Sequence, residues 1–169
     1  MDGRSRGDAA FRAFAVAAGP PLFRSALLLS GDWHLAEDLV QDTLARMYRM
    51  WGGIGRIDNP AAYAQSVLVR QFLSHRRRRS SGERPSEHLP ETAAGGPDAD
   101  LRLSLVAALA QLQKRDRAVV VLRYLADRSV EQVAIDLGRT PSAVKIQSMR
   151  ALAKLRVALG DDLLLLIQN

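Results

Sequence analysis

Apolar residues recur at helical spacing through the first half of the chain, in stripes separated by turn residues. The stripes run over residues 11–18, 22–29 and 35–51. Gly19-Pro20-Pro21 separates the first two and predicts a break, because proline lacks the amide hydrogen that a helix interior needs. Asp32 is placed to cap the third helix with its carboxylate.

A fourth helix is predicted from Asn59-Pro60 toward the arginine run Arg76–Arg79. Asparagine caps a helix well, and proline suits the first helical position. The inner stripe of this helix includes Tyr63 and Phe72. The first half of the chain therefore reads as a small helical domain over residues 8–79.

The C-terminal half contains two short helices joined by a tight turn. Ser129 and Gln132 form a capping box, in which each side chain satisfies a backbone N–H of the first turn. Gly138 suits the left-handed conformation that ends a helix. Thr140-Pro141 then starts the next helix with a cap and a first-turn proline. This is the plan of a helix-turn-helix.

The second helix of this unit has two faces of different chemistry. One face is apolar and is expected to point inward: Val144, Ala151, Leu152 and Leu155. The other is expected to point outward: Lys145, Ile146, Met149 and Arg150. An ordinary helical hairpin with solvated charges is the simpler alternative. Because the caps, the turn and the cationic face occur together, a helix-turn-helix that binds DNA is favoured over that alternative.

Residues 80–100 change in composition and become rich in proline, glycine, serine and acid. Five acidic residues against one arginine give this stretch a net charge of −4, while the whole chain carries +6. Such composition predicts a flexible linker. The expected fold is therefore all-α, with two small helical domains over residues 8–79 and 101–158 and a tail over 159–169.

Composition narrows the classes of function. Hydrophobic residues make up 47% of the 169 residues and aromatic residues only 5%, which favours helix over sheet. The net charge of +6 indicates an anionic partner, with nucleic acid first. The absence of cysteine excludes disulfides, thiolate catalysis and cysteine-based zinc sites. The apolar run 163–167 is too short to cross a membrane and the N-terminus lacks a signal pattern, so we expect a cytoplasmic protein.

Two charge clusters in the first domain have two explanations each. Glu37, Asp38 and Asp42 suit either a helix N-terminus or a basic protein partner. Arg70 with the run Arg76–Arg79 suits either a solvated helix end or a polyanion that neutralises the mutual repulsion.

The order of these features resembles the sigma-70 family, in particular the extracytoplasmic-function (ECF) sigma factors of the actinobacterial SigE-like type. The resemblance covers about residues 11–156 and rests on the segments 36–51 and 109–125 together with the helix-turn-helix. It implies that residues 8–79 are region 2, which binds core RNA polymerase and the −10 promoter element. It implies that the second domain is region 4, which binds the −35 element, and that the linker follows a basic path through polymerase.

The resemblance also implies roles for single residues. It implies that core polymerase is bound, at its β′ clamp helices, by Asp38, Gln41 and Asp42. Contact with −10 DNA falls to Tyr63, Arg70, Arg76, Arg77, Arg78 and Arg79, although Tyr63 suits a plain core aromatic equally well. Contact with −35 DNA falls to Arg139, Thr140, Ser142, Lys145, Ile146, Met149, Arg150 and Lys154. Arg123 and Arg128 are candidates for phosphate or polymerase.

Two positions depart from the family pattern. Arg70 stands where asparagine is frequent in the loop that holds the flipped −10 base, and Ile146-Gln147 replaces a frequent Ser-Arg pair. The implied partners are core polymerase through its clamp helices and β flap, promoter DNA and, as a further candidate, an anti-sigma factor. No membrane partner is implied.

Two other classes of function remain as alternatives. A stand-alone helix-turn-helix regulator would use the first domain for dimerisation and bind DNA without polymerase. An enzyme is disfavoured, because the three histidines are scattered and no histidine–carboxylate cluster has metal-ligand spacing. We expect no catalytic residue, no metal and no cofactor.

Overall fold

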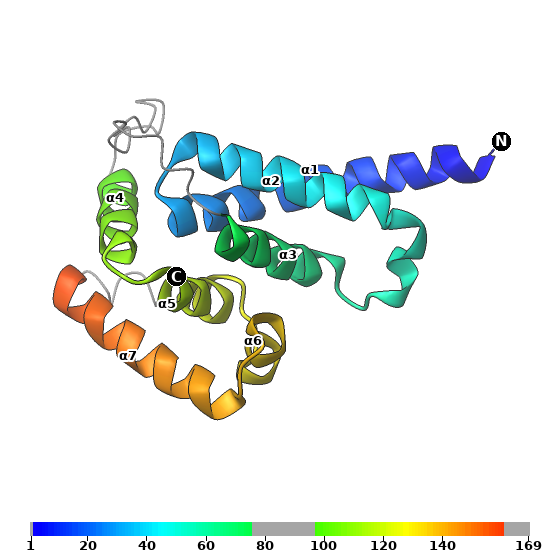
Figure 1. The fold of residues 1–169 in the computed structure, drawn as a ribbon. Helices are drawn as coiled ribbons and strands as arrows, with labels where there is room; N and C mark the ends of the chain where they lie inside the picture. The colour runs from blue at the N-terminus through cyan, green and yellow to red at the C-terminus, as the bar shows by residue number, and fades with distance from the viewer. Residues whose placement is uncertain (1, 76–96, 161–169) are drawn as a thin grey trace.

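The structure, a computed structural model, describes residues 2–75 and 97–160, which are helical apart from short turns (Figure 1). The first module contains α1 (Asp2–Ser30), α2 (Trp33–Arg49), the 3-10 helix η1 (Trp51–Arg56) and α3 (Pro60–Ser74). The second contains α4 (Pro97–Ala110), α5 (Lys114–Val120), the π-helical turn η2 (Val121–Leu125), α6 (Val130–Leu137) and α7 (Pro141–Leu159). The all-α prediction is confirmed for these residues.

Helix α1 runs without interruption through Gly19-Pro20-Pro21, so the predicted break is wrong. The two prolines remove hydrogen bonds to the carbonyls of Val16 and Ala17, four residues earlier. Both prolines and both of these residues are exposed, so water can satisfy the freed carbonyls. Packing of the buried Ala18 and Leu22 on either side then holds the helix together.

The predicted helix starts are confirmed by their hydrogen bonds. Asp32 Oδ1 accepts from Leu35 N at 2.8 Å, and Asn59 Oδ1 accepts from Ala62 N at 2.9 Å. Both halves of the capping box between Ser129 and Gln132 are present. Thr140 Oγ1 likewise accepts from the third residue of α7, Ala143, at 3.2 Å. These starts are local, which explains why the sequence alone predicts them.

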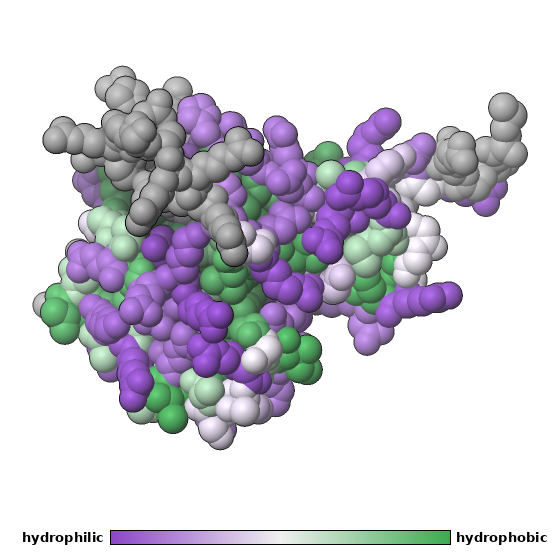
Figure 2. All heavy atoms as spheres, viewed as in Figure 1, coloured by the Kyte–Doolittle hydropathy of each residue, from purple (hydrophilic) through white to green (hydrophobic). Residues whose placement is uncertain are grey.

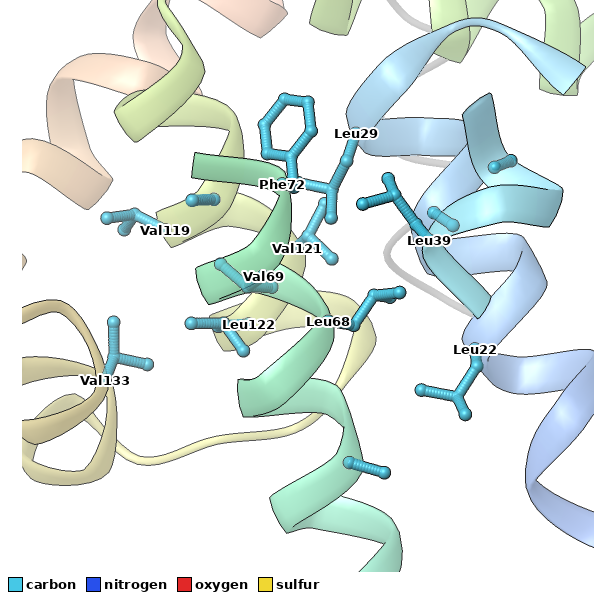
Figure 3. Packing of buried hydrophobic residues seen from close by; sticks show 14 of the residues in the cluster. Leu22, Leu29, Leu39, Leu68, Val69, Phe72, Val119, Val121, Leu122 and Val133 are labelled. Carbon is cyan, nitrogen blue, oxygen red and sulfur yellow. The ribbon is translucent and has the colours of Figure 1, made fainter. Parts of the chain in front are cut away.

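The apolar core is shared by the two modules. One cluster joins residues of α1, α2 and α3 to residues of α5, η2, α6 and α7. Figure 3 shows Val69 and Phe72 of α3 between Leu29 on one side and Val119 and Leu122 on the other. A second cluster lies between α4, α5 and α7 and includes Leu109 and Leu155. Polar side chains cover most of the face seen in Figure 2, with smaller apolar areas between them. The sequence does not predict this contact between modules.

Some predicted features fall elsewhere. Helix α4 begins at Pro97, inside the range 80–100 that we predict as linker, so the last part of that range is helical. The arginine run Arg76–Arg79, the rest of the linker and the tail after Gly160 lie outside the described residues.

Among the residues that the structure describes, one helix is long and apolar enough, by length and composition, to cross a membrane: residues Arg6–Ser30 of α1, with a mean hydropathy of 1.4. Its apolarity also has an internal use, because Leu22, Ala26 and Leu29 are buried in the shared core. Part of the apolarity of this helix therefore serves to hold α1 against α2 and α3.

We expect Gly138→Ala to lower the free energy of unfolding by about 1–2 kcal/mol. Gly138 ends α6 in the left-handed region at φ 60°, where a Cβ is strained even though no atom lies within 4 Å. Gly52→Ala is the matched control, because that glycine also has open space but no positive φ. Denaturant unfolding of both variants would measure the difference. Equal stability of the two variants would contradict the role of the turn.

Candidate nucleic-acid and protein interfaces

Helix α7 presents a mixed cationic and apolar face to solvent. Lys145, Ile146, Met149 and Arg150 are all exposed, with Met149 at 69%. On the opposite side Val144, Ala151 and Leu155 are buried, and Leu152 is half-buried. The outward and inward residues predicted for this helix are therefore confirmed. An exposed helix with cationic and apolar side chains can enter a major groove.

Helix α7 is anchored to α5 through Asp116. Gln147 Nε2 donates to Asp116 Oδ1 at 2.8 Å, and Lys154 Nζ lies 3.7 Å from Asp116 Oδ2. Gln147 is half-buried at this contact, which helps to fix the orientation of α7. In the sequence Gln147 is only a departure from the family pattern, because nothing local to α7 indicates a partner in α5.

Positive charge gathers beside the turn before α7. A cavity of about 220 Å³ is lined by Leu73, Lys114, Arg115, Leu137, Arg139 and Gln147. Three of these side chains are cationic and none is acidic. Arg139 and Ser142 are exposed, whereas the hydroxyl of Thr140 is engaged as the α7 cap. The turn therefore offers a cationic surface for phosphate, which positions a protein on DNA.

On α3, the guanidinium of Arg70 lies over the ring of Tyr63, 5.8 Å from its centroid. Arg70 is exposed, Tyr63 is half-buried against the core, and Arg70 Nε donates to Ser66 O at 3.2 Å. The ring thus belongs to the edge of the core and lies next to a cation. Such a pair is suited to stacking of a base next to a phosphate.

An acidic face lies on α2. Asp38, Gln41 and Asp42 are exposed, and none of them has a hydrogen bond or ion pair with another described residue. The neighbouring Glu37 differs, because its carboxylate accepts from Trp33 Nε1 at 3.0 Å. Helix α2 begins at Trp33, and the macrodipole acts mainly within the first turn. The macrodipole therefore does not explain why acidic residues stand at positions 38 and 42. A basic partner for Asp38 and Asp42 does explain them.

Arg128 is not available to DNA or polymerase in this arrangement, which corrects its candidacy. Its guanidinium donates to Asp136 Oδ2 at 3.0 Å and to Ser66 Oγ at 3.1 Å, and its side chain is 15% exposed. Arg123 is half-buried and donates to the Arg128 carbonyl. Both arginines therefore have structural partners.

Within the described part of the chain, no group of histidine and carboxylate side chains could hold a metal.

Known protein families match both halves of the chain. The family described as Sigma-70 region 2 matches residues 8–82, and Sigma-70, region 4 matches residues 102–155. The RNA polymerase sigma-E factor of Streptomyces coelicolor is 38% identical over 138 residues, covering 80% of this chain and 77% of that protein. This chain belongs to the sigma-70 family.

Other sigma factors are similar over most of their length. The ECF RNA polymerase sigma factor SigL of Mycobacterium tuberculosis is 35% identical over 149 residues, covering 83% of each chain. The solved sigma factor RpoE of Bartonella quintana, in complex with the anti-sigma factor NepR, has a TM-score of 0.74 at 25% identity. That match covers 90% of this chain and 98% of RpoE.

The chain is therefore an RNA polymerase sigma factor of the ECF group, as its sequence resemblance implied. Sigma factors bind core RNA polymerase and promoter DNA to start transcription, and they are initiation factors without catalysis of their own. The family membership supports this function and not the alternative of a regulator that acts without polymerase.

Proposed function

We propose that region 2 of this sigma factor docks on core polymerase through Asp38, Gln41 and Asp42. The unpartnered acidic face of α2 is the observation that carries the proposal. Gln41 and Asp42 follow Asp38 by three and four residues, so their side chains lie on the same side of the helix as that of Asp38. They match a basic helical surface such as the β′ clamp helices, and the β flap would receive region 4. The alternative of a stand-alone DNA-binding protein does not explain this acidic face.

We also propose which residues touch promoter DNA. Arg150 and Lys145 read base edges of the −35 element, with Ile146 and Met149 in apolar contact in the groove. Arg139, Ser142, Lys154 and the turn at Thr140 position the phosphate backbone. Tyr63 and Arg70 contact the −10 element, and the arginines of the run Arg76–Arg79 are assigned there from their sequence alone. The protein acts in the cytoplasm, where its polymerase is, and catalysis belongs to the polymerase.

The test is transcription by core polymerase from the same source, supplied with this protein and a genomic DNA library. Transcripts that start from sites sharing two spaced elements would support the proposal and reveal both elements. Co-purification with core without specific initiation would contradict the DNA contacts proposed here. Failure to bind core at all would contradict the docking face.

We expect Tyr63→Ala to weaken open-complex formation by about 1–3 kcal/mol, the contribution of one stacked base. Tyr124→Ala is a matched control, because Tyr124 also lies under an arginine, with Arg123 Cζ 5.6 Å from its centroid. Tyr124 belongs to region 4, away from the −10 contacts. Permanganate footprinting of the melted strand measures the effect. A similar loss in both variants would assign Tyr63 to the core alone.

A further inference from the structure

Asp116 lies in the first turn of α5, where an acidic side chain is stabilised by the helix macrodipole. Its side chain is only 16% exposed, and both carboxylate oxygens meet side chains of α7. Gln147 Nε2 donates to Oδ1 at 2.8 Å, and Lys154 Nζ lies 3.7 Å from Oδ2. Val120 of α5 and Ala151 of α7 share one apolar cluster, so packing as well as polar contact holds the carboxylate against α7.

Arg150 stands between the two partners of this carboxylate on the surface of α7. It follows Gln147 by three residues and precedes Lys154 by four, and side chains at these spacings are neighbours on one side of a helix. Arg150 itself is exposed and has no hydrogen bond or ion pair with another described residue. The guanidinium proposed to read a −35 base is therefore a neighbour, along the helix, of both side chains that engage Asp116.

A carboxylate with free oxygens at this place would compete with DNA for Arg150. Arginine binds a carboxylate through the same planar fork of donors with which it reads guanine, so one contact excludes the other. Lys154 alone occupies the carboxylate weakly, because its side chain is 59% exposed and an exposed ion pair contributes little. Gln147 is half-buried and makes the shorter contact. Gln147 is thus the stronger of the two partners of Asp116.

We propose that Gln147 is a positioning residue for base reading: it occupies the carboxylate of Asp116 and so leaves the guanidinium of Arg150 free for the −35 element. The proposal rests on the proposed function, in which Arg150 reads a base edge. It assigns a use to position 147, where this sequence departs from the frequent arginine of the family. Because its amide is directed to α5, Gln147 does not itself read DNA.

Gln147→Ala tests the proposal, because alanine keeps the helix and frees Asp116 Oδ1. Core polymerase with the full-length chain would transcribe a library of −35 variants, and Arg150→Ala identifies the base pair that Arg150 reads. We expect Gln147→Ala to lower the preference for that same base pair by about three- to tenfold, the range for a partly solvated contact to a charged group. An unchanged preference would overturn the proposal. A loss of preference at a different base pair would also overturn it, because Gln147 would then read DNA itself.

Gln113→Ala is the matched control for this measurement. Gln113 is an exposed glutamine at the N-cap of α5, and its side chain makes no cap hydrogen bond. We expect the base preference of this variant to equal that of the wild type. Gln147→Met is a second test variant, because methionine fills similar space without a donor and protects the packing of α7 if alanine disturbs it. Circular dichroism melting shows which variants retain their helices.

Asp116→Asn separates the charge of residue 116 from its anchoring of α7. Asparagine keeps an oxygen that can accept from Gln147, but it has no charge to attract Arg150. We expect the double variant Gln147→Ala, Asp116→Asn to recover the base preference that Gln147→Ala loses, although the hydrogen bond between α5 and α7 is absent from both. A double variant as defective as Gln147→Ala would assign Gln147 to anchoring alone and refute its role in base reading.

The free chain offers a measurement that needs no polymerase. By nuclear magnetic resonance, the Nε–H of Arg150 should exchange rapidly with water in the wild type, because the side chain is exposed. In Gln147→Ala we expect slower exchange and a shifted Nε signal, since a bound carboxylate protects that hydrogen. An unchanged signal would refute capture of Arg150 by Asp116 and leave the proposed function standing. A captured Arg150 with an unchanged base preference would instead refute the proposed base contact of Arg150, and with it the use assigned to Gln147.

Discussion

Replacing Asp38 and Asp42 together with arginine is expected to abolish binding to core polymerase. Both carboxylates are exposed and have no described partner, so the change removes nothing from the fold. Two attractive charges become repulsive toward a basic surface. Truncation of one member of an interfacial charge pair costs about 2–5 kcal/mol, and reversal of two costs at least as much. We therefore expect a loss of affinity of more than about a hundredfold.

The measurement is pull-down of the double variant with core polymerase, followed by titration in solution. Asp58→Arg is the control, because Asp58 is an exposed carboxylate of region 2 that lies outside α2. Thermal unfolding of both variants should stay close to that of the wild type, since exposed substitutions usually change stability by less than about 0.5 kcal/mol. Retained core binding by the double variant would remove α2 from the interface.

Alanine at Arg150 or at Lys145 is expected to weaken use of the preferred promoter by about 1–3 kcal/mol each if these side chains read base edges. Their exposure on the outer face of α7 leaves both side chains free to enter a groove. The loss should be confined to promoters that carry the preferred base at one −35 position. At other bases the variants should approach the wild type, because a lost specific contact costs nothing where it was never made.

Lys154→Ala and Arg102→Ala separate base reading from phosphate contact. Lys154 lies on α7, where its ammonium group is 3.7 Å from Asp116 Oδ2. Because we propose that Lys154 contacts phosphate, its loss should weaken all promoters alike and reduce the salt dependence of binding. Arg102 lies on the exposed surface of α4 and should have little effect. The readout is initiation from a library of −35 variants by each mutant. A uniform loss across that library for Arg150→Ala would assign Arg150 to phosphate.

Local signals explain why much of the candidate site was predictable. A cap, a left-handed glycine and a one-sided stripe each depend on residues within about four positions of one another. The capping box at Ser129, the turn at Gly138 and the outward face of α7 therefore followed from the sequence. The break at Pro20-Pro21 failed for the opposite reason. There, packing of Ala18 and Leu22 against the core outweighed a local helix-breaking signal.

The sequence by itself determined the helices, their caps, the cationic reading face and the membership of the chain in the sigma-70 family. Tertiary structure decided which charges are free to meet a partner. Asp38 and Arg150 remain exposed, whereas Arg128 and Arg117 are committed to Ser66 and to the end of α1, partners 62 and 88 residues away in sequence. Periodicity carries no information about such pairings, because they arise only when two modules bring their buried faces together.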